Sequence, residues 1–260
     1  MVNALAYLSS LLVLLWYSST RTNHIEATSC SKINHLKYCY YSGTTNRIIY
    51  YFHGYGNSVT AWSWNRVTKR IISDWDKQGV DRPNIVSLSY SSLWWHNAKK
   101  QIEVDNAISW LENNVIKKEA LSRYFYGDSM GAYNALRFAN NSKHQIDGLA
   151  LICPAIPRTI TNNPKTKLKG FIPLSYTASR VIKDSLNDQN WTIYSEKIKN
   201  ENLKSYVVTT PVDQFGFYLG GVHLSDYLKE STKKSSSIYE EQEVIHCQID
   251  TKKLAQFLAN

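Results

Sequence analysis

A single serine stands between two glycines in the segment Gly127-Asp-Ser129-Met-Gly131. This spacing is typical of a sharp turn from a strand into a helix, where small flanking residues let neighbouring backbones approach and the hydroxyl stands above a sheet. A plain strand-turn-helix connection is the alternative. The flanks favour the sharp turn, because LSRYF before it suits a buried strand and AYNALRFANN after it has apolar residues at helical spacing. Ser129 is therefore predicted to be a nucleophile.

A serine nucleophile needs hydrogen-bond donors for the oxyanion that forms on the attacked carbonyl. The segment HGYG (53–56) follows the apolar run RIIYYF, and its glycines let the backbone bend so that the Tyr55 N–H faces a ligand. The second predicted donor is the N–H of Met130, at the start of the helix after the serine. A simple glycine turn at 53–56 is the alternative interpretation.

The predicted general base is His246, because it follows the last strand pattern and precedes the closing helix. His223 and His96 remain as competitors. The predicted acid is Asp213, which follows the strand pattern SYVVTT and whose carboxylate would accept the Nδ1–H of the base. Asp226 is the fallback.

Three further residues are assigned to substrate binding. Asp128 lies beside the serine, and its alternative roles are a surface or helix-capping carboxylate or a group that tunes a neighbour's pKa. Trp94 and Trp95 lie in a loop near the expected mouth of the sheet and, with Trp62 and Trp64, would form an apolar platform for an acyl or aryl group. Core packing is the commoner fate of tryptophan.

Strand and helix patterns alternate from about residue 45, which predicts an α/β fold with a mostly parallel sheet. Strands are expected at 47–52, 84–90, 121–125, 146–152, 205–210 and 237–245. Helices are expected at 61–79, 98–115, 132–141, 224–231 and 252–260. A Lys- and Asn-rich stretch with several prolines interrupts the rhythm at about 154–204 and is expected to be an insertion, either a lid or a solvated excursion.

The N-terminal residues 1–27 are expected to form a signal peptide, which leaves 28–260 as one domain. The apolar run at 4–17 is shorter than the about 20 residues of a transmembrane helix, and a small-residue cleavage site lies near Ala27. A secreted or periplasmic protein is therefore predicted. Because no Lys or Arg precedes the run and Arg21 follows it, an uncleaved anchor with membrane association is the alternative.

The charge distribution and the cysteine positions bear on the partners, disulfides and cofactors of the protein. The net charge is +9, yet the basic residues are scattered, so a solvated basic surface is favoured and no nucleic-acid partner is predicted. Cys30 and Cys39 flank a short polar segment and are expected to pair after export, and Cys153 with Cys247 is a second candidate pair. No zinc-type spacing or phosphate-binding loop occurs in the sequence, so neither a metal nor a cofactor is predicted.

Four motifs, YFHGYG, YGDSMGAYNAL, VDQF and VIHCQ, resemble in order and spacing an α/β-hydrolase of the serine esterase type. The segment GDSMGAYNAL is similar to the elbow of the esterase group that includes S-formylglutathione hydrolase and feruloyl esterases. The resemblance spans about residues 45–260. It implies the α/β-hydrolase fold, a triad of Ser129, His246 and Asp213, an acyl-enzyme intermediate and no metal or organic cofactor.

The leading hypothesis is thus an exported serine hydrolase that acts on a small-molecule or lipid-like ester. The same groups would also serve a thioesterase, a peptidase or an acyltransferase. A hydrolase-fold binding protein without turnover and a membrane-attached interaction protein are hypotheses from other classes. The sequence makes no prediction of the oligomeric state.

Overall fold

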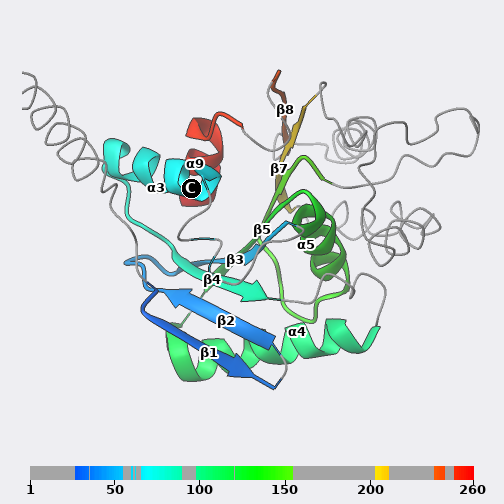
Figure 1. Ribbon diagram of the computed structural model, residues 1–260. Coiled ribbons are helices and arrows are strands. Elements are labelled where there is room, and N and C mark those ends of the chain that lie inside the picture. Colours follow the sequence, from blue (N-terminus) through cyan, green and yellow to red (C-terminus); the bar gives the residue numbers. More distant parts are fainter. Residues whose placement is uncertain are drawn as a thin grey trace, which may run out of the picture.

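One sheet forms the centre of the computed structural model (Figure 1). The structure describes residues 27–34, 36–54, 60, 62, 66–89, 98–119, 121–154, 203–210, 237–243 and 249–260. Within these residues the strands are β1 (Ser29–Ile33), β2 (Leu36–Tyr41), β3 (Arg47–Phe52), β4 (Asn84–Ser89), β5 (Ser122–Asp128), β6 (Gly148–Ile152), β7 (Lys204–Thr209) and β8 (Ser237–Glu241). Their order across the sheet is β1-β2-β4-β3-β5-β6-β7-β8.

The sheet is mostly parallel, as the alternating pattern predicts. β1 with β2 and β2 with β4 pair antiparallel, and every other neighbouring pair is parallel. The carboxyl ends of β3, β4, β5, β6, β7 and β8 therefore lie along one edge. In open parallel sheets this is the edge at which ligands bind.

The helices cover both faces of this sheet. Those described are α3 (Arg66–Gln78), α4 (Ala98–Leu111), which continues as a π-helical turn η1 (Glu112–Ile116), α5 (Met130–Asn141) and α9 (Lys252–Ala259). Figure 1 shows α3 and α9 together on one side and α4 and α5 on the other. The four predicted helices that fall on described residues are confirmed, with ends shifted by a few residues.

Each strand of the sheet's centre packs against helices on both faces. In β3, Ile48, Tyr50 and Phe52 belong to the core beneath α4 and α5, whereas Ile49 and Tyr51 belong to the core beneath α3 and α9. All five side chains are fully buried. Because both faces are covered, such a strand has apolar residues at successive positions instead of alternating ones.

The start of the fold differs from the sequence prediction, which placed the first strand at residue 47. The hairpin of β1 and β2 comes earlier and extends the sheet by two strands, with Asn34 at a φ of 55° between them. Residues of β1 are exposed or half-buried, so the segment lacks the apolar pattern that marks the later strands.

A disulfide between Cys30 and Cys39 joins this hairpin, as predicted. The two residues face each other in the β1–β2 ladder, so the bond crosses directly between neighbouring strands. A disulfide fits an extracellular location. Cys153 is buried, and its candidate partner Cys247 lies outside the described residues.

Several predicted elements lie outside the described residues: the apolar run 4–17, the helix at 224–231 and nearly all of the insertion at 154–204. Among the described helices, none has the length and apolar character that crossing a membrane requires.

Candidate active site

Ser129 lies in the turn between β5 and α5, at the carboxyl edge of the sheet. Its backbone has φ 53° and ψ −117°, a conformation that residues with a Cβ rarely adopt. Strain of this kind, on a serine between a strand and a helix, is the mark of a nucleophile elbow. The structure thus has the sharp turn that the glycine spacing predicts.

Close backbone contacts on both sides of the turn explain the two glycines. A Cβ added to Gly127 would lie 2.3 Å from the carbonyl carbon of Gly131. A Cβ on Gly131 would lie 1.9 Å from the carbonyl oxygen of Phe52, in β3. Neither position has room for a methyl group, because the obstacles are backbone atoms of the adjoining strand and helix.

Backbone hydrogen bonds hold the strained residue from both directions. The Ser129 N–H donates to the Ile152 carbonyl at 2.8 Å, which ties the turn to the end of β6. The Ser129 carbonyl accepts from Ala132 N at 3.1 Å and Tyr133 N at 3.4 Å, in the first turn of α5. Met130, the predicted second oxyanion donor, is the first residue of that helix, where backbone N–H groups favour anions.

The predicted oxyanion turn begins beside Ser129. Gly54 follows β3, and a Cβ added to it would lie 3.3 Å from the Asp128 carbonyl oxygen and 3.6 Å from the Ser129 Cβ. The structure therefore brings together two segments that are some 75 residues apart in the sequence. Tyr55, the predicted donor itself, lies outside the described residues.

His53 is buried at the base of this turn. Its Nδ1 lies 2.9 Å from the Gly54 carbonyl oxygen, and because a carbonyl only accepts, Nδ1 carries the proton of the neutral ring. Burial lowers the pKa of His53 and outweighs the opposing effect of that hydrogen bond. A neutral imidazole thus supports the turn by donating to its backbone.

Asp128 is buried, with 5 % of its surface exposed, so the interpretation as a surface carboxylate is wrong. The Tyr51 hydroxyl donates to its Oδ1 at 3.3 Å. The Tyr51 ring stacks on Tyr126 with centroids 5.1 Å apart, so the hydroxyl that meets the carboxylate belongs to a pair of stacked rings. Sequence alone offers no signal for this burial, because the partner comes from β3.

Trp62 packs in the core and does not belong to a surface platform. Its side chain is fully buried, with ring centroids 5.3 Å from Tyr51, 6.0 Å from Tyr126 and 6.3 Å from Trp75. Of the other tryptophans considered for that platform, Trp64, Trp94 and Trp95 lie outside the described residues.

The predicted base and acid also lie outside the described residues, as do their competitors. The strands that precede them are described. Asp213 follows β7, which ends at Thr209, and His246 follows β8, which ends at Glu241. Since β5, β6, β7 and β8 run parallel, the chain leaves β7 and β8 at the edge where Ser129 lies.

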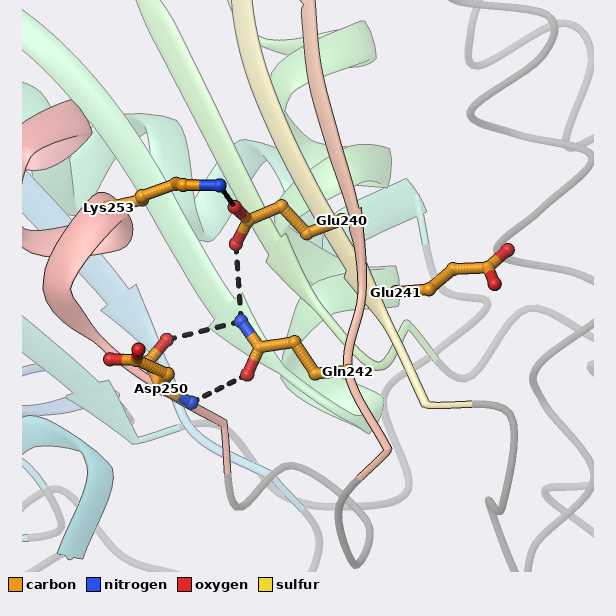
Figure 2. A pocket seen from close by; sticks show the side chains of 5 residues that line it. All are labelled: Glu240, Glu241, Gln242, Asp250 and Lys253. Carbon is orange, nitrogen blue, oxygen red and sulfur yellow. Dashed lines mark hydrogen bonds and ion pairs between the residues drawn. The ribbon is translucent and has the colours of Figure 1, made fainter.

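A polar cluster at the end of β8 was not predicted from the sequence. A hollow of about 300 Å³ lies between this strand and α9 and is lined by Glu240, Glu241, Gln242, Asp250 and Lys253 (Figure 2). Burial opposes ionisation of Glu240, but hydrogen bonds from Lys253 and Tyr206 outweigh it and lower the pKa of that carboxyl. Burial, with the bond to Glu240, raises the pKa of Tyr206. Among the described residues, no group of three or more acidic, His or Cys side chains is placed to hold a metal ion.

Comparison of the whole chain with solved structures gives many similar folds. An esterase of Pyrococcus furiosus shares 16% identity and a TM-score of 0.60, covering 90% of this chain and 89% of its own. S-formylglutathione hydrolase of Staphylococcus aureus shares 12% identity and a TM-score of 0.61, covering 86% and 93%. The Francisella virulence factor BioJ shares 16% identity and a TM-score of 0.63, covering 97% and 90%.

By sequence, the chain matches no protein-family model and no curated protein. The likeness to solved structures therefore establishes the fold. Together with the strand order and the strained serine between β5 and α5, it identifies this chain as having the α/β-hydrolase fold.

Proposed function

We propose that the protein is an exported serine hydrolase that cleaves carboxylic esters through an acyl-enzyme intermediate. One observation carries the proposal: Ser129 adopts a strained backbone at the carboxyl edge of the sheet, with Gly54 packed against it. A strained backbone conformation persists only where the surrounding structure enforces it, and such conformations are concentrated at active sites. The structural neighbours described above include the esterase of Pyrococcus furiosus, which favours ester bonds as the target.

In the proposed mechanism His246 accepts the Ser129 hydroxyl proton while the Ser129 Oγ attacks the ester carbonyl. Asp213 stabilises the imidazolium that forms. The N–H groups of Tyr55 and Met130 hold the negative charge on the carbonyl oxygen. The imidazolium then gives its proton to the departing alcohol. A water molecule attacks the acyl-enzyme by the reverse sequence of proton transfers, which releases the acid and restores Ser129.

The substrate is proposed to be a small or lipid-like ester that needs no cofactor. Trp94, Trp95 and Asp128 are proposed to line its binding site. Asp128 immediately precedes Ser129 and its carboxylate accepts from the Tyr51 hydroxyl, which supports a position next to the reacting atoms. A thioester, an amide or an acyl transfer would use the same groups, and the choice depends on the residues that contact the leaving group.

Export is proposed from the signal-like residues 1–27, and the Cys30–Cys39 disulfide supports it. The mature chain would then be a single hydrolase domain over 28–260, with the insertion at about 154–204. An N-terminal anchor is the alternative. Intact mass of the protein recovered from the medium separates the two, since cleavage near Ala27 removes the apolar run.

The function is tested with a fluorophosphonate probe, which forms a stable adduct with activated serines, and with p-nitrophenyl acetate and octanoate as substrates. We expect one adduct by intact mass on the wild type and none on Ser129→Ala. Hydrolysis should fall in Ser129→Ala by about three orders of magnitude or more, the usual cost of removing a nucleophile.

Ser109→Ala is the matched control. The Ser109 Oγ lies 3.2 Å from His144 Nε2, so it is a serine with a histidine neighbour that does not lie in a sharp strand-to-helix turn. This variant should keep both the adduct and the turnover. A folded wild type that takes no adduct would contradict the proposal and favour a binding protein of the same fold.

A further inference from the structure

Gln242 joins the two ends of the segment 243–249. Its Oε1 accepts from the Asp250 backbone N–H at 2.6 Å, and its Nε2 donates to the Asp250 carbonyl at 3.3 Å. One side-chain amide thus pairs with both backbone groups of a single residue on the far side of the segment (Figure 2).

The neighbouring charges determine which way the Gln242 amide points. Nε2 also donates to Glu240 Oε2 at 3.1 Å, and Glu240 itself is held by the Tyr206 hydroxyl and by Lys253. A flipped amide would place its oxygen against the Glu240 carboxylate and its NH₂ against the Asp250 N–H. Both contacts would be repulsive, so the observed orientation is the only favourable one.

The two ends that Gln242 joins are attached to different parts of the fold. Gln242 N donates to Thr209 O at 3.0 Å, which extends the pairing of β8 with β7. On the far side, Arg70 donates to the Ile249 carbonyl at 3.2 Å and Thr251 donates to Asp74 at 2.7 Å. These bonds fix the far end to α3. The Gln242 amide therefore ties the sheet edge to the α3–α9 layer.

We propose that Gln242 is a positioning residue for the general base, because the segment that it closes carries His246. This inference rests on the proposed function. A base must lie within hydrogen-bond reach of the serine hydroxyl, and a displacement of about 1 Å can cost up to a hundredfold in rate. Holding both ends of its segment at one place limits that displacement.

The test compares Gln242→Ala and Gln242→Glu with the wild type. Glutamate keeps the shape of glutamine but has no N–H for the Asp250 carbonyl, and its charge faces Glu240. We expect kcat to fall about tenfold in both variants with KM unchanged, because the base moves and the substrate contacts do not. The rate of fluorophosphonate labelling should fall by the same factor.

Hydrogen exchange supplies a readout that does not depend on turnover. Peptides covering 243–249 should exchange faster in both variants, whereas peptides of α5 should not change. Gln145→Ala is the matched control, since Gln145 is an exposed glutamine whose amide donates to Asp147 at 3.1 Å. Should Gln242→Ala fail to fold, Glu240→Gln keeps the Gln242–Asp250 pair, weakens its anchor and should give a smaller loss of kcat.

The outcomes separate this inference from the proposed function. A labelled wild type with unchanged kcat in Gln242→Ala and Gln242→Glu overturns the inference alone, whatever the exchange shows. Unchanged exchange at 243–249 also overturns it. A wild type that neither labels nor turns over removes the proposed function, and the positioning role with it.

Discussion

The turn that carries Ser129 and the edge between β8 and α9 are held in opposite ways. At the turn, backbone atoms of β3, β5 and α5 touch, and glycine is required because nothing larger fits. At the edge, exposed or half-buried side chains of Gln242, Glu240 and Lys253 make the connections. Contacts between backbones tolerate no substitution, whereas contacts between partly solvated side chains compete with water and are individually weak.

The largest effect is expected from Gly131→Ala. The added methyl group would lie 1.9 Å from the Phe52 carbonyl oxygen, so β3 and α5 would have to separate. We expect a loss of more than about 3 kcal/mol in the free energy of unfolding, measured by urea denaturation. Gly79→Ala is the control: its φ is +60° but no atom lies within 4 Å of the added Cβ, so it should cost only about 1 kcal/mol. Equal costs would show that the backbone contact is unimportant.

Gly54→Ala should lower the activity strongly while leaving the stability almost unchanged. Its Cβ would lie 3.3 Å from the Asp128 carbonyl oxygen, which is tight but can be relieved by a small shift. That shift moves the predicted oxyanion turn relative to Ser129. We expect kcat/KM for p-nitrophenyl acetate to fall about a hundredfold, as when one oxyanion donor is lost. The urea midpoint should change little, and a large drop in that midpoint would mean that the turn is structural.

As the pH falls, the protein should first lose stability through His53, which lies beside the turn that carries Ser129. The pKa of His53 is lowered from its ordinary value of 6.5, so the folded state binds fewer protons than the unfolded state just below that pH. Its contribution to stability is present above about pH 6.5 and is lost as the pH falls through the folded-state pKa. The urea midpoint of the wild type should therefore decline in this window, and that of His53→Asn should decline less. Parallel pH curves would contradict this role for His53.

At the edge between β8 and α9, the loss of stability on acidification should begin at lower pH and should be smaller. The pKa of Glu240 is lowered from its ordinary value of 4.5, so its contribution is present above about pH 4.5 and is lost as the pH falls through the folded-state value. Glu240→Gln should flatten the pH dependence of the urea midpoint only below that pH. Added salt should shrink the difference between the variant and the wild type, because Lys253 is exposed to solvent.

Two residues show where sequence prediction failed. The burial of Asp128 depends on Tyr51, which is 77 positions away and reaches it only because β3 and β5 are neighbours. The role of Gln242 depends on its side chain meeting the backbone of Asp250 beyond an intervening segment. A single glutamine in a polar stretch forms no sequence pattern from which such a contact could be predicted.

The sequence by itself determined the strands that are buried on both faces, the helix periods and the sharp turn at Ser129. These follow from local rules: apolar runs need burial, and glycines are placed where a backbone must bend or be approached. Only the tertiary structure decided that Gly54 lies against Ser129, that β1 and β2 join the sheet, and that Trp62 belongs to the core. Each of these depends on which elements become neighbours, and that is decided by packing across the sheet instead of by any local pattern.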